Sequence, residues 1–262
     1  MAEPLFTPDG DRFIPSVHTR GPWGPTAQHA GPPAALMGRA IEALPSAAPM
    51  CVARFTLEVL RPVPLEPLTV TARVERPGRR VELVSATLST DSIELCRATA
   101  WRIRVADPGI GAGDVVAEIA PPDSGEPHIP ESDKPAFHRT GVEMRFVHGS
   151  FWKPGPATVW IRLRHPVVAD ESPSPLMRAL CAADFGNGVG AELEFGKYLF
   201  INTDLTAYLF RQPVGEWICL DARTYVGPSG AALAESALHD VRGRVGRSLQ
   251  ALLVDNLPGA GG

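Results

Sequence analysis

A carboxylate at the end of an apolar run, Asp184, is the residue best suited to acid–base chemistry. It closes the segment PLMRALCAAD, in which Met177, Leu180 and Cys181 recur at helical spacing. The carboxylate is predicted on the face that these three form, where burying it unpaired would be costly. That placement favours a general base that takes a proton from water. The alternative is that Asp184 ends the helix before Gly186 or pairs with a buried arginine.

A second polar side chain, Gln250, lies in the alternating segment SLQALLV near the end of the chain. The alternation predicts a strand that is otherwise largely apolar. An amide both donates and accepts hydrogen bonds, so it could orient a water molecule beside a carboxylate. The alternative is that Gln250 only satisfies the edge of a sheet.

A third group of polar residues begins the predicted strand 199–211. Asn202 and Asp204 share one face by the two-residue period of a strand, and Thr203 points the other way. Only one of Asn202 and Thr203 can therefore face the site of Asp184. For Asp204 we favour a carboxylate at a strand end over a catalytic one.

The start of the first predicted helix supplies the remaining candidates, His29 and Gly31. Exposed N–H groups at a helix N-terminus stabilise negative charge that develops on a carbonyl oxygen, and Gly31 lies where that helix begins. His29 could contact the substrate beside it. The alternative for His29 is an ordinary loop residue.

Several other patterns are set aside. The sequence has no GxSxG motif, which argues against an α/β-hydrolase nucleophile. Its histidines show no paired metal-ligand spacing, so we expect no metal and no cofactor. Asp133 and His138 have the spacing of a hydratase pair, but they lie in a Pro-rich segment without the surrounding motif.

That Pro-rich segment, residues 106–140, divides the chain into a first half, 1–105, and a second half, 141–258. Each half is predicted to hold one helix, 34–44 and 175–187, before a series of strands. The strands of the first half are predicted at 12–15, 55–59, 68–75, 81–89 and 93–105. Those of the second are predicted at 141–152, 157–164, 199–211, 216–226, 231–241 and 246–255.

The two halves align with each other when one is shifted by 150 residues. The shift matches Arg61 with Arg211, Glu66 with Glu216, Ala72–Arg73 with Ala222–Arg223, Leu83 with Leu233, Leu88 with Leu238, and Arg97 with Arg247. It also places Ala100 opposite Gln250, so the first half lacks that polar group. We interpret the halves as an ancient duplication that packs as a pseudo-dimer.

Whole phrases of the chain resemble the acyl-CoA thioesterase II-like family. In the first half these are HAGPPAALMGRAIEAL and RFTLEVLRPVPLEPLTVTARVERPGRRVELVSATL. In the second half they are CAADFGNG, INTDLTAYLFRQPVGEW and GRSLQALLVD. The resemblance implies an α+β double hot-dog fold, in which each repeat has a long central helix wrapped by a curved antiparallel sheet.

The resemblance also implies a reaction: hydrolysis of a fatty acyl-CoA thioester to a free fatty acid and CoA, without a cofactor. The water would be held by Asp184, Gln250 and the Asn202 or Thr203 position. One alternative is a non-catalytic protein that binds acyl-CoA or lipid in the same pocket. A hydratase or dehydratase is disfavoured, because its Asp/His pair has no credible place in the chain.

Composition narrows the remaining classes. The 262 residues carry a net charge of −4, which argues against broad binding of nucleic acid. No apolar run approaches the about 20 residues of a membrane span, and the first residues do not resemble a secretory signal. The four cysteines are widely spaced, as expected of reduced thiols in the cytoplasm. The sequence leaves three points open: the length of the acyl chain, whether the thiol carrier is CoA or acyl-carrier protein, and whether the chain forms a homo-oligomer.

Overall fold

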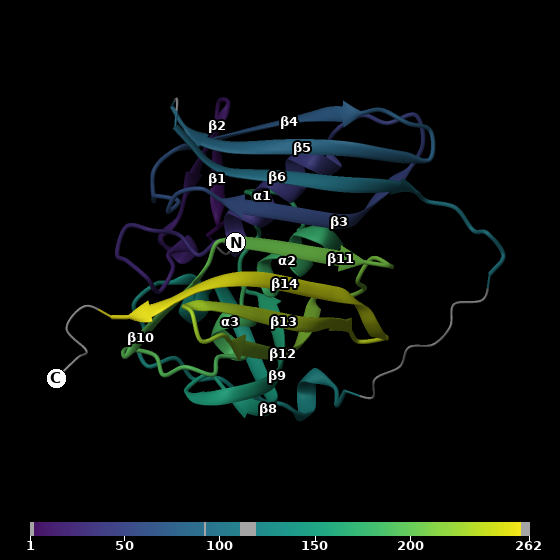
Figure 1. Ribbon diagram of the computed structural model, residues 1–262. Helices are drawn as coiled ribbons and strands as arrows, with labels where there is room; N and C mark the ends of the chain where they lie inside the picture. The colour runs from purple at the N-terminus through teal and green to yellow at the C-terminus, as the bar shows by residue number, and fades with distance from the viewer. Residues whose placement is uncertain (1–2, 92, 111–118, 258–262) are drawn as a thin grey trace.

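A single antiparallel sheet organises the computed structural model, which describes residues 3–91, 93–110 and 119–257. Its strands follow the order β1-β2-β4-β5-β6-β3-β11-β14-β13-β12-β9-β8-β7, and β10 also pairs with β14. The helices α1 and α2 lie together against one side of this sheet (Figure 1). A sheet that is polar on one face and apolar on the other buries its apolar face in this way.

The first half contains one long helix and six strands. These are β1 Phe6–Asp9, β2 Arg12–Pro15, α1 Gly31–Glu42, β3 Met50–Val59, β4 Leu68–Arg76, β5 Val81–Thr90 and β6 Ile93–Arg104. The predicted strands and helix are confirmed here, apart from shifts at their ends. The strand β1 was not predicted, because only its first residue, Phe6, is buried and no alternation is visible.

The second half has the same kinds of element. These are β8 Val142–Ser150, β9 Lys153–Leu163, α2 Pro175–Ala183, α3 Gly186–Val189, β10 Tyr198–Asn202, β11 Asp204–Leu209, β12 Trp217–Val226, β13 Ala231–Asp240 and β14 Gly243–Asn256. The strand predicted at 231–241, whose composition would also suit a helix, is confirmed as β13. Its residues alternate between exposed and buried over most of its length.

The segment 106–140 folds in part. Residues 111–118 lie outside the described residues, as does residue 258 at the end of the predicted second half. After them come a short turn, η2 Pro122–Ser124, the two-residue strand β7 Glu126–Pro127 and a π-helical turn, η3 Phe137–Gly141. The strand β7 pairs with β8, so the end of this segment belongs to the edge of the sheet.

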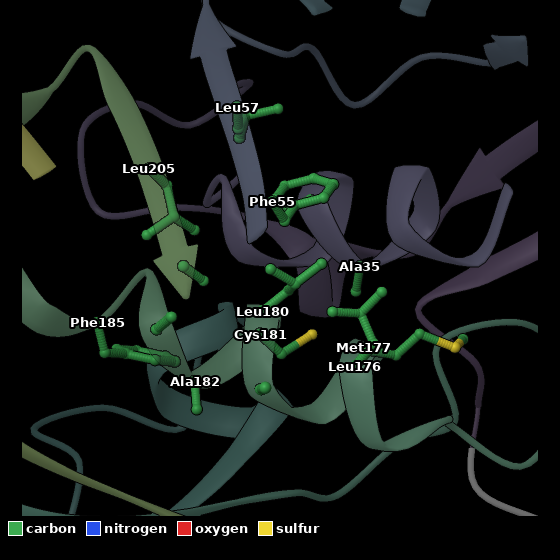
Figure 2. Close-up of a cluster of buried hydrophobic side chains, with 14 of the residues drawn as sticks. Ala35, Phe55, Leu57, Leu176, Met177, Leu180, Cys181, Ala182, Phe185 and Leu205 are labelled. Carbon is green, nitrogen blue, oxygen red and sulfur yellow. The ribbon is translucent and has the colours of Figure 1, made fainter. Parts of the chain in front are cut away.

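The two helices pack closely where α1 has a glycine. A Cβ on Gly38 of α1 would lie 2.7 Å from Cδ1 of Leu180 on α2, so a larger residue would displace this leucine side chain. At the start of α2, Ser174 accepts a hydrogen bond from the Met177 N–H at 3.1 Å. Figure 2 shows Ala35 of α1 and Leu180 of α2 near Phe55 of β3, in one buried apolar cluster. Among the described residues, no helix is long and apolar enough to cross a membrane.

The strands β3 and β11 join the two halves into one sheet. They pair antiparallel, with Thr56 opposite Thr206, and the two hydroxyl oxygens lie 3.2 Å apart. Each strand is irregular on one side of this pair. The ladder of β3 with β6 shifts between Val52 and Arg54, and the predicted strand 199–211 is interrupted at Thr203.

Candidate active site

The carboxylate of Asp184 lies where α2 ends and is only 2% exposed. The helix predicted over 175–187 breaks at this point into α2 and α3, so Asp184 follows the last helical residue of α2. Three side chains reach the carboxylate from other elements. Asn202 Nδ2 donates to Oδ1 at 2.9 Å, Gln250 Nε2 donates to Oδ1 at 3.2 Å, and His29 Nδ1 lies 2.7 Å from Oδ2.

The amide of Gln250 is held on both sides. It lies on β14, is 1% exposed, and its Oε1 accepts the Asn187 N–H of α3 at 3.0 Å. With Oε1 occupied, the NH₂ group must face Asp184. Gly186 makes this contact possible, because a Cβ there would lie 2.9 Å from Oε1 of Gln250.

The structure distinguishes Asn202 from Thr203, the two candidates at the interruption between β10 and β11. Asn202, at the end of β10, turns its amide towards Asp184. Thr203 is exposed, and both its N–H and its hydroxyl donate to the Ala251 carbonyl, at 3.0 and 3.3 Å. Asp204 Oδ1 accepts the Ala251 N–H at 2.7 Å, so this carboxylate completes the strand end. Asn202 is therefore the residue that contacts the carboxylate.

His29 brings the first half of the chain into the site. Its ring packs against Phe137 and Phe185, with centroids 5.1 and 4.5 Å away, and these two rings also stack on each other at 5.4 Å. Nδ1 also lies 3.3 Å from the Gly31 N–H, but one nitrogen cannot both donate to Asp184 and accept from Gly31. The shorter contact to the carboxylate assigns the proton to Nδ1, which leaves Nε2 as the acceptor. The sequence pointed to His29, but as a substrate contact and not as a partner of Asp184.

The N-terminus of α1 has few free donors. Gly31 begins the helix, and the next two residues, Pro32 and Pro33, have no N–H. The Ala34 N–H already bonds to the Ala30 carbonyl at 2.9 Å. Gly31 itself is buried against α2, where a Cβ would lie 2.9 Å from the Cys181 carbonyl oxygen. Its N–H faces His29, so the predicted role of the helix start rests on this N–H and on that of the preceding residue, Ala30.

A cavity of about 260 Å³ lies beside the Asp184 carboxylate. His29, Asp184 and Asn202 form part of its wall, together with Thr203 and Arg61. Most of the remaining wall is apolar and includes four aromatic rings: Trp23, Phe151, Phe185 and Phe195. Such a cavity suits an apolar group attached to a polar reacting centre.

One cavity residue was set aside in the sequence, His138. It lies in the π-helical turn η3, is 6% exposed, and its ring stacks with Phe151 at a centroid distance of 6.1 Å. Burial, with a smaller contribution from the neighbouring His29, lowers the pKa of His138 to about 4. Asp133, its suspected partner, is exposed. The Pro-rich composition around His138 concealed the short apolar turn that carries it.

The buried thiols of Cys96 and Cys181 are unsuited to nucleophilic catalysis. Burial, followed by the charge of Asp184, raises the pKa of Cys96 to about 12, and burial also raises the pKa of Cys181. Both thiols stay protonated at neutral pH and are poor nucleophiles. Within the described ranges, no group of three or more His, Cys, Asp or Glu side chains could hold a metal ion.

Solved structures with the same architecture cover nearly the whole chain. A conserved protein with a hot-dog fold from Alicyclobacillus acidocaldarius has a TM-score of 0.75 at 16% identity, over 96% of this chain and 95% of its own. A protein from Thermobifida fusca YX, provisionally assigned as a thioesterase II, has a TM-score of 0.75 at 18% identity, over 94% and 93%. An acyl-CoA thioesterase II from Mycobacterium marinum has a TM-score of 0.63 at 17% identity, over 89% and 91%. The chain therefore has the hot-dog fold.

Sequence profiles of protein families identify the chain more directly. The profile of the acyl-CoA thioesterase N-terminal domain matches residues 19–103. The profile of the acyl-CoA thioesterase C-terminal domain matches residues 116–254, more than half of the chain. A search among curated proteins found no match. Both family matches agree with the resemblance seen in the sequence phrases, and the chain belongs to the acyl-CoA thioesterase family.

Proposed function

We propose that this protein hydrolyses acyl-CoA thioesters to a free carboxylic acid and CoA. The observation that supports this best is the Asp184 carboxylate in the wall of an apolar cavity, contacted by Asn202, Gln250 and His29. A buried carboxylate held by three side chains keeps one orientation, as a group that positions a reactant must. Fatty acyl chains are the substrate class that the apolar wall and the family suggest.

In the proposed reaction, water attacks the thioester carbonyl and Asp184 accepts its proton. Oδ1 already accepts two hydrogen bonds, whereas Oδ2 accepts only the one from His29 and has a lone pair left for water. The new C–O bond gives a tetrahedral oxyanion. Its collapse breaks the C–S bond, and the proton held by Asp184 passes to the sulfur of CoA.

The supporting residues have distinct roles in this proposal. Asn202 and Gln250 fix Oδ1, and Gln250 is fixed in turn by the Asn187 N–H. His29 orients Oδ2 and stabilises its negative charge. All three contact the carboxylate and are positioning residues.

We also propose that the halves 1–105 and 141–258 are two hot-dog repeats connected by 106–140. The pairing of Thr56 with Thr206 supports this, since the two are 150 residues apart and Leu57–Leu205 and Phe55–Ala207 flank them symmetrically. The irregularity of β3 after Val52 has its equivalent in the interruption at Thr203. At the position equivalent to Gln250 the first half has Ala100, which is buried, so the first half has no equivalent of this amide.

One observation favours a second function, the binding of acyl-CoA without turnover. Asp184 is almost fully buried, and three of its four lone-pair directions are occupied. If water cannot reach the fourth lone pair of the carboxylate, the protein would bind an acyl-CoA in this cavity without hydrolysing it.

A panel of acyl-CoA substrates, assayed for released thiol, tests the hydrolysis. The wild type should release CoA from at least one member, and Asp184→Asn should lose most of this activity. Asp204→Asn is the matched control, because this carboxylate accepts only the Ala251 N–H in the strand end, which an amide oxygen also accepts. Tight binding of acyl-CoA by a wild type that releases no thiol would replace the proposed function with the second one.

A further inference from the structure

The proposed hydrolysis requires a donor for the carbonyl oxygen, which becomes an oxyanion during attack. Asn202 and Gln250 direct their NH₂ groups at Asp184, and His29 directs its Nδ1 proton there. At the start of α1, the expected source of donors, the Gly31 N–H is turned towards His29, Pro32 and Pro33 have no N–H, and the Ala30 N–H is left. An oxyanion is commonly stabilised by two donors, so a second one would come from another part of the cavity wall.

His138 is a side chain in that wall without an assigned partner. It is 6% exposed, and within the described part of the chain Nδ1 is enclosed with no hydrogen-bond partner. The turn that carries it is anchored on both sides. The Phe137 N–H donates to the Arg20 carbonyl at 2.8 Å, and Thr140 contacts His18 Nδ1 at 2.7 Å.

The surroundings of Nδ1 decide which nitrogen carries the proton in the neutral ring. An enclosed N–H without an acceptor is less tolerable than an enclosed acceptor without a donor. Nδ1 is therefore the bare nitrogen, and the proton lies on Nε2. The ring faces the same cavity as His29 and Asp184, so Nε2–H is available to a molecule bound there.

We propose that His138 donates a hydrogen bond from Nε2 to the carbonyl oxygen of the bound acyl thioester. This inference rests on the proposed function. It supplies a donor that the start of α1 lacks, because Pro32 and Pro33 have no N–H. The donor is neutral. It stabilises the developing oxyanion without giving up its proton, so the water's proton still passes through Asp184 to sulfur.

The charged and titratable groups near His138 are consistent with a neutral ring. His29 and His128 are basic neighbours, and Arg139 is held in an ion pair with Glu131. Glu131 is the acidic group that favours a charged His138, and this ion pair offsets its effect. The ring therefore stays an uncharged donor through the neutral pH range.

The test compares two kinds of CoA ligand that cannot be hydrolysed. In one, a methylene replaces the sulfur and the carbonyl is retained. The other is an S-alkyl thioether with no carbonyl. Each kind of ligand is prepared with a group the length of octanoyl and with one the length of phenylacetyl. The dissociation constant of each is measured with the full-length protein.

His138→Phe keeps the stacking on Phe151 and removes the donor, whereas His138→Gln keeps a donor. His128→Phe is the matched control, because His128 also stacks on Phe151, at 5.0 Å, and has an enclosed unpartnered nitrogen, but is not part of the cavity wall. We expect His138→Phe to weaken binding of the ketone about tenfold more than binding of the thioether. His138→Gln should recover part of this difference, and His128→Phe should show none.

Hydrolysis gives a second readout. Where the wild type cleaves a substrate, kcat of His138→Phe should fall about 10²-fold, the usual cost of losing one oxyanion donor, with a smaller change in KM. Equal effects on ketone and thioether, or a wild type that binds neither, would overturn the proposal. A selective loss of ketone binding in a wild type that does not hydrolyse would support His138 and refute the hydrolysis. If His138→Phe does not fold, His138→Leu, which also removes the donor, replaces it in the same comparison of ketone and thioether.

Discussion

Nδ1 of His29 and Oδ2 of Asp184 lie 2.7 Å apart, and this contact joins the loop before α1 to the end of α2. It completes the set of hydrogen bonds around a carboxylate that would otherwise be buried with one oxygen unpaired. Buried charges are tolerated in proteins when they are paired in this way. The contact makes the orientation of Asp184 depend on both halves of the chain.

Replacing Asp184 with asparagine should abolish most activity with little change in Tm. The new Oδ1 can accept from Asn202 and Gln250, and the new NH₂ can donate to His29 once its proton moves to Nε2. The hydrogen bonds therefore survive while the base is lost, and kcat should fall by about 10²–10⁴-fold. Steady-state kinetics and thermal melts of both proteins measure this. A drop in Tm of many degrees with activity retained would show that Asp184 is only structural.

The effects of Asp184 and Gln250 on kcat should not add. Both act on the position of one water molecule, so removing either already misplaces it. Gln250→Ala should cost less than Asp184→Asn, because the amide orients the carboxylate and takes no proton. The double variant should be scarcely slower than Asp184→Asn alone. Multiplicative losses in this double-mutant cycle would mean that the two residues act independently.

Gly186→Ala should impair catalysis without changing any polar residue. Its methyl group would lie 2.9 Å from both Gln250 Oε1 and Ser236 Oγ, so the amide must move away from Asp184. We expect kcat to fall at least about tenfold, in line with the sensitivity of catalysis to small displacements. An activity equal to that of the wild type would contradict the role of Gln250.

The stability of the protein should fall on acidification because of His138. Its pKa is lowered from 6.5 to about 4, so between these values the unfolded chain binds a proton that the folded protein does not. The free energy of unfolding therefore decreases as the pH falls through this window, by at most about 3 kcal/mol for this residue. Above about pH 6.5 the ring is neutral in both states and has no effect.

Denaturant unfolding of the wild type and His138→Phe between pH 4 and 7 isolates this contribution. His18, His128 and His239 also have lowered pKa values and destabilise both proteins in acid. The variant should therefore show a shallower pH dependence, not a flat one. Parallel curves would mean that His138 is accessible to protons in the folded state.

The elements of this fold were largely readable from the sequence, because alternation and helical spacing are local signals. The strand β13 shows this, since its alternation and its place in the repeat were enough to set aside a helix. Element ends were less predictable. The helix was predicted to continue to residue 187, whereas α2 ends at Ala183 with Asp184 as its C-cap, the alternative that the following Gly186 had suggested.

Part of the candidate site could also be predicted from the sequence. Asp184, Gln250 and Asn202 were singled out by residue type and by the family resemblance, and they lie together in the structure; their catalytic role stays a prediction. The contact of His29 with Asp184 could not be read from spacing, since it joins residues from different halves. His138 was hidden because composition marked its segment as a linker, while its burial comes from Phe151 and other distant residues.

The division of the site between the halves has a consequence for how the protein matures. A folding intermediate could hold all the strands of the second half and still lack the imidazole that His29 contributes. The proposed site would then form only when α1 docks on α2, so enzymatic activity would be the last property to appear during refolding. Far-ultraviolet circular dichroism would recover first, and a chain cut within 106–140 would regain function only if its two fragments reassociate.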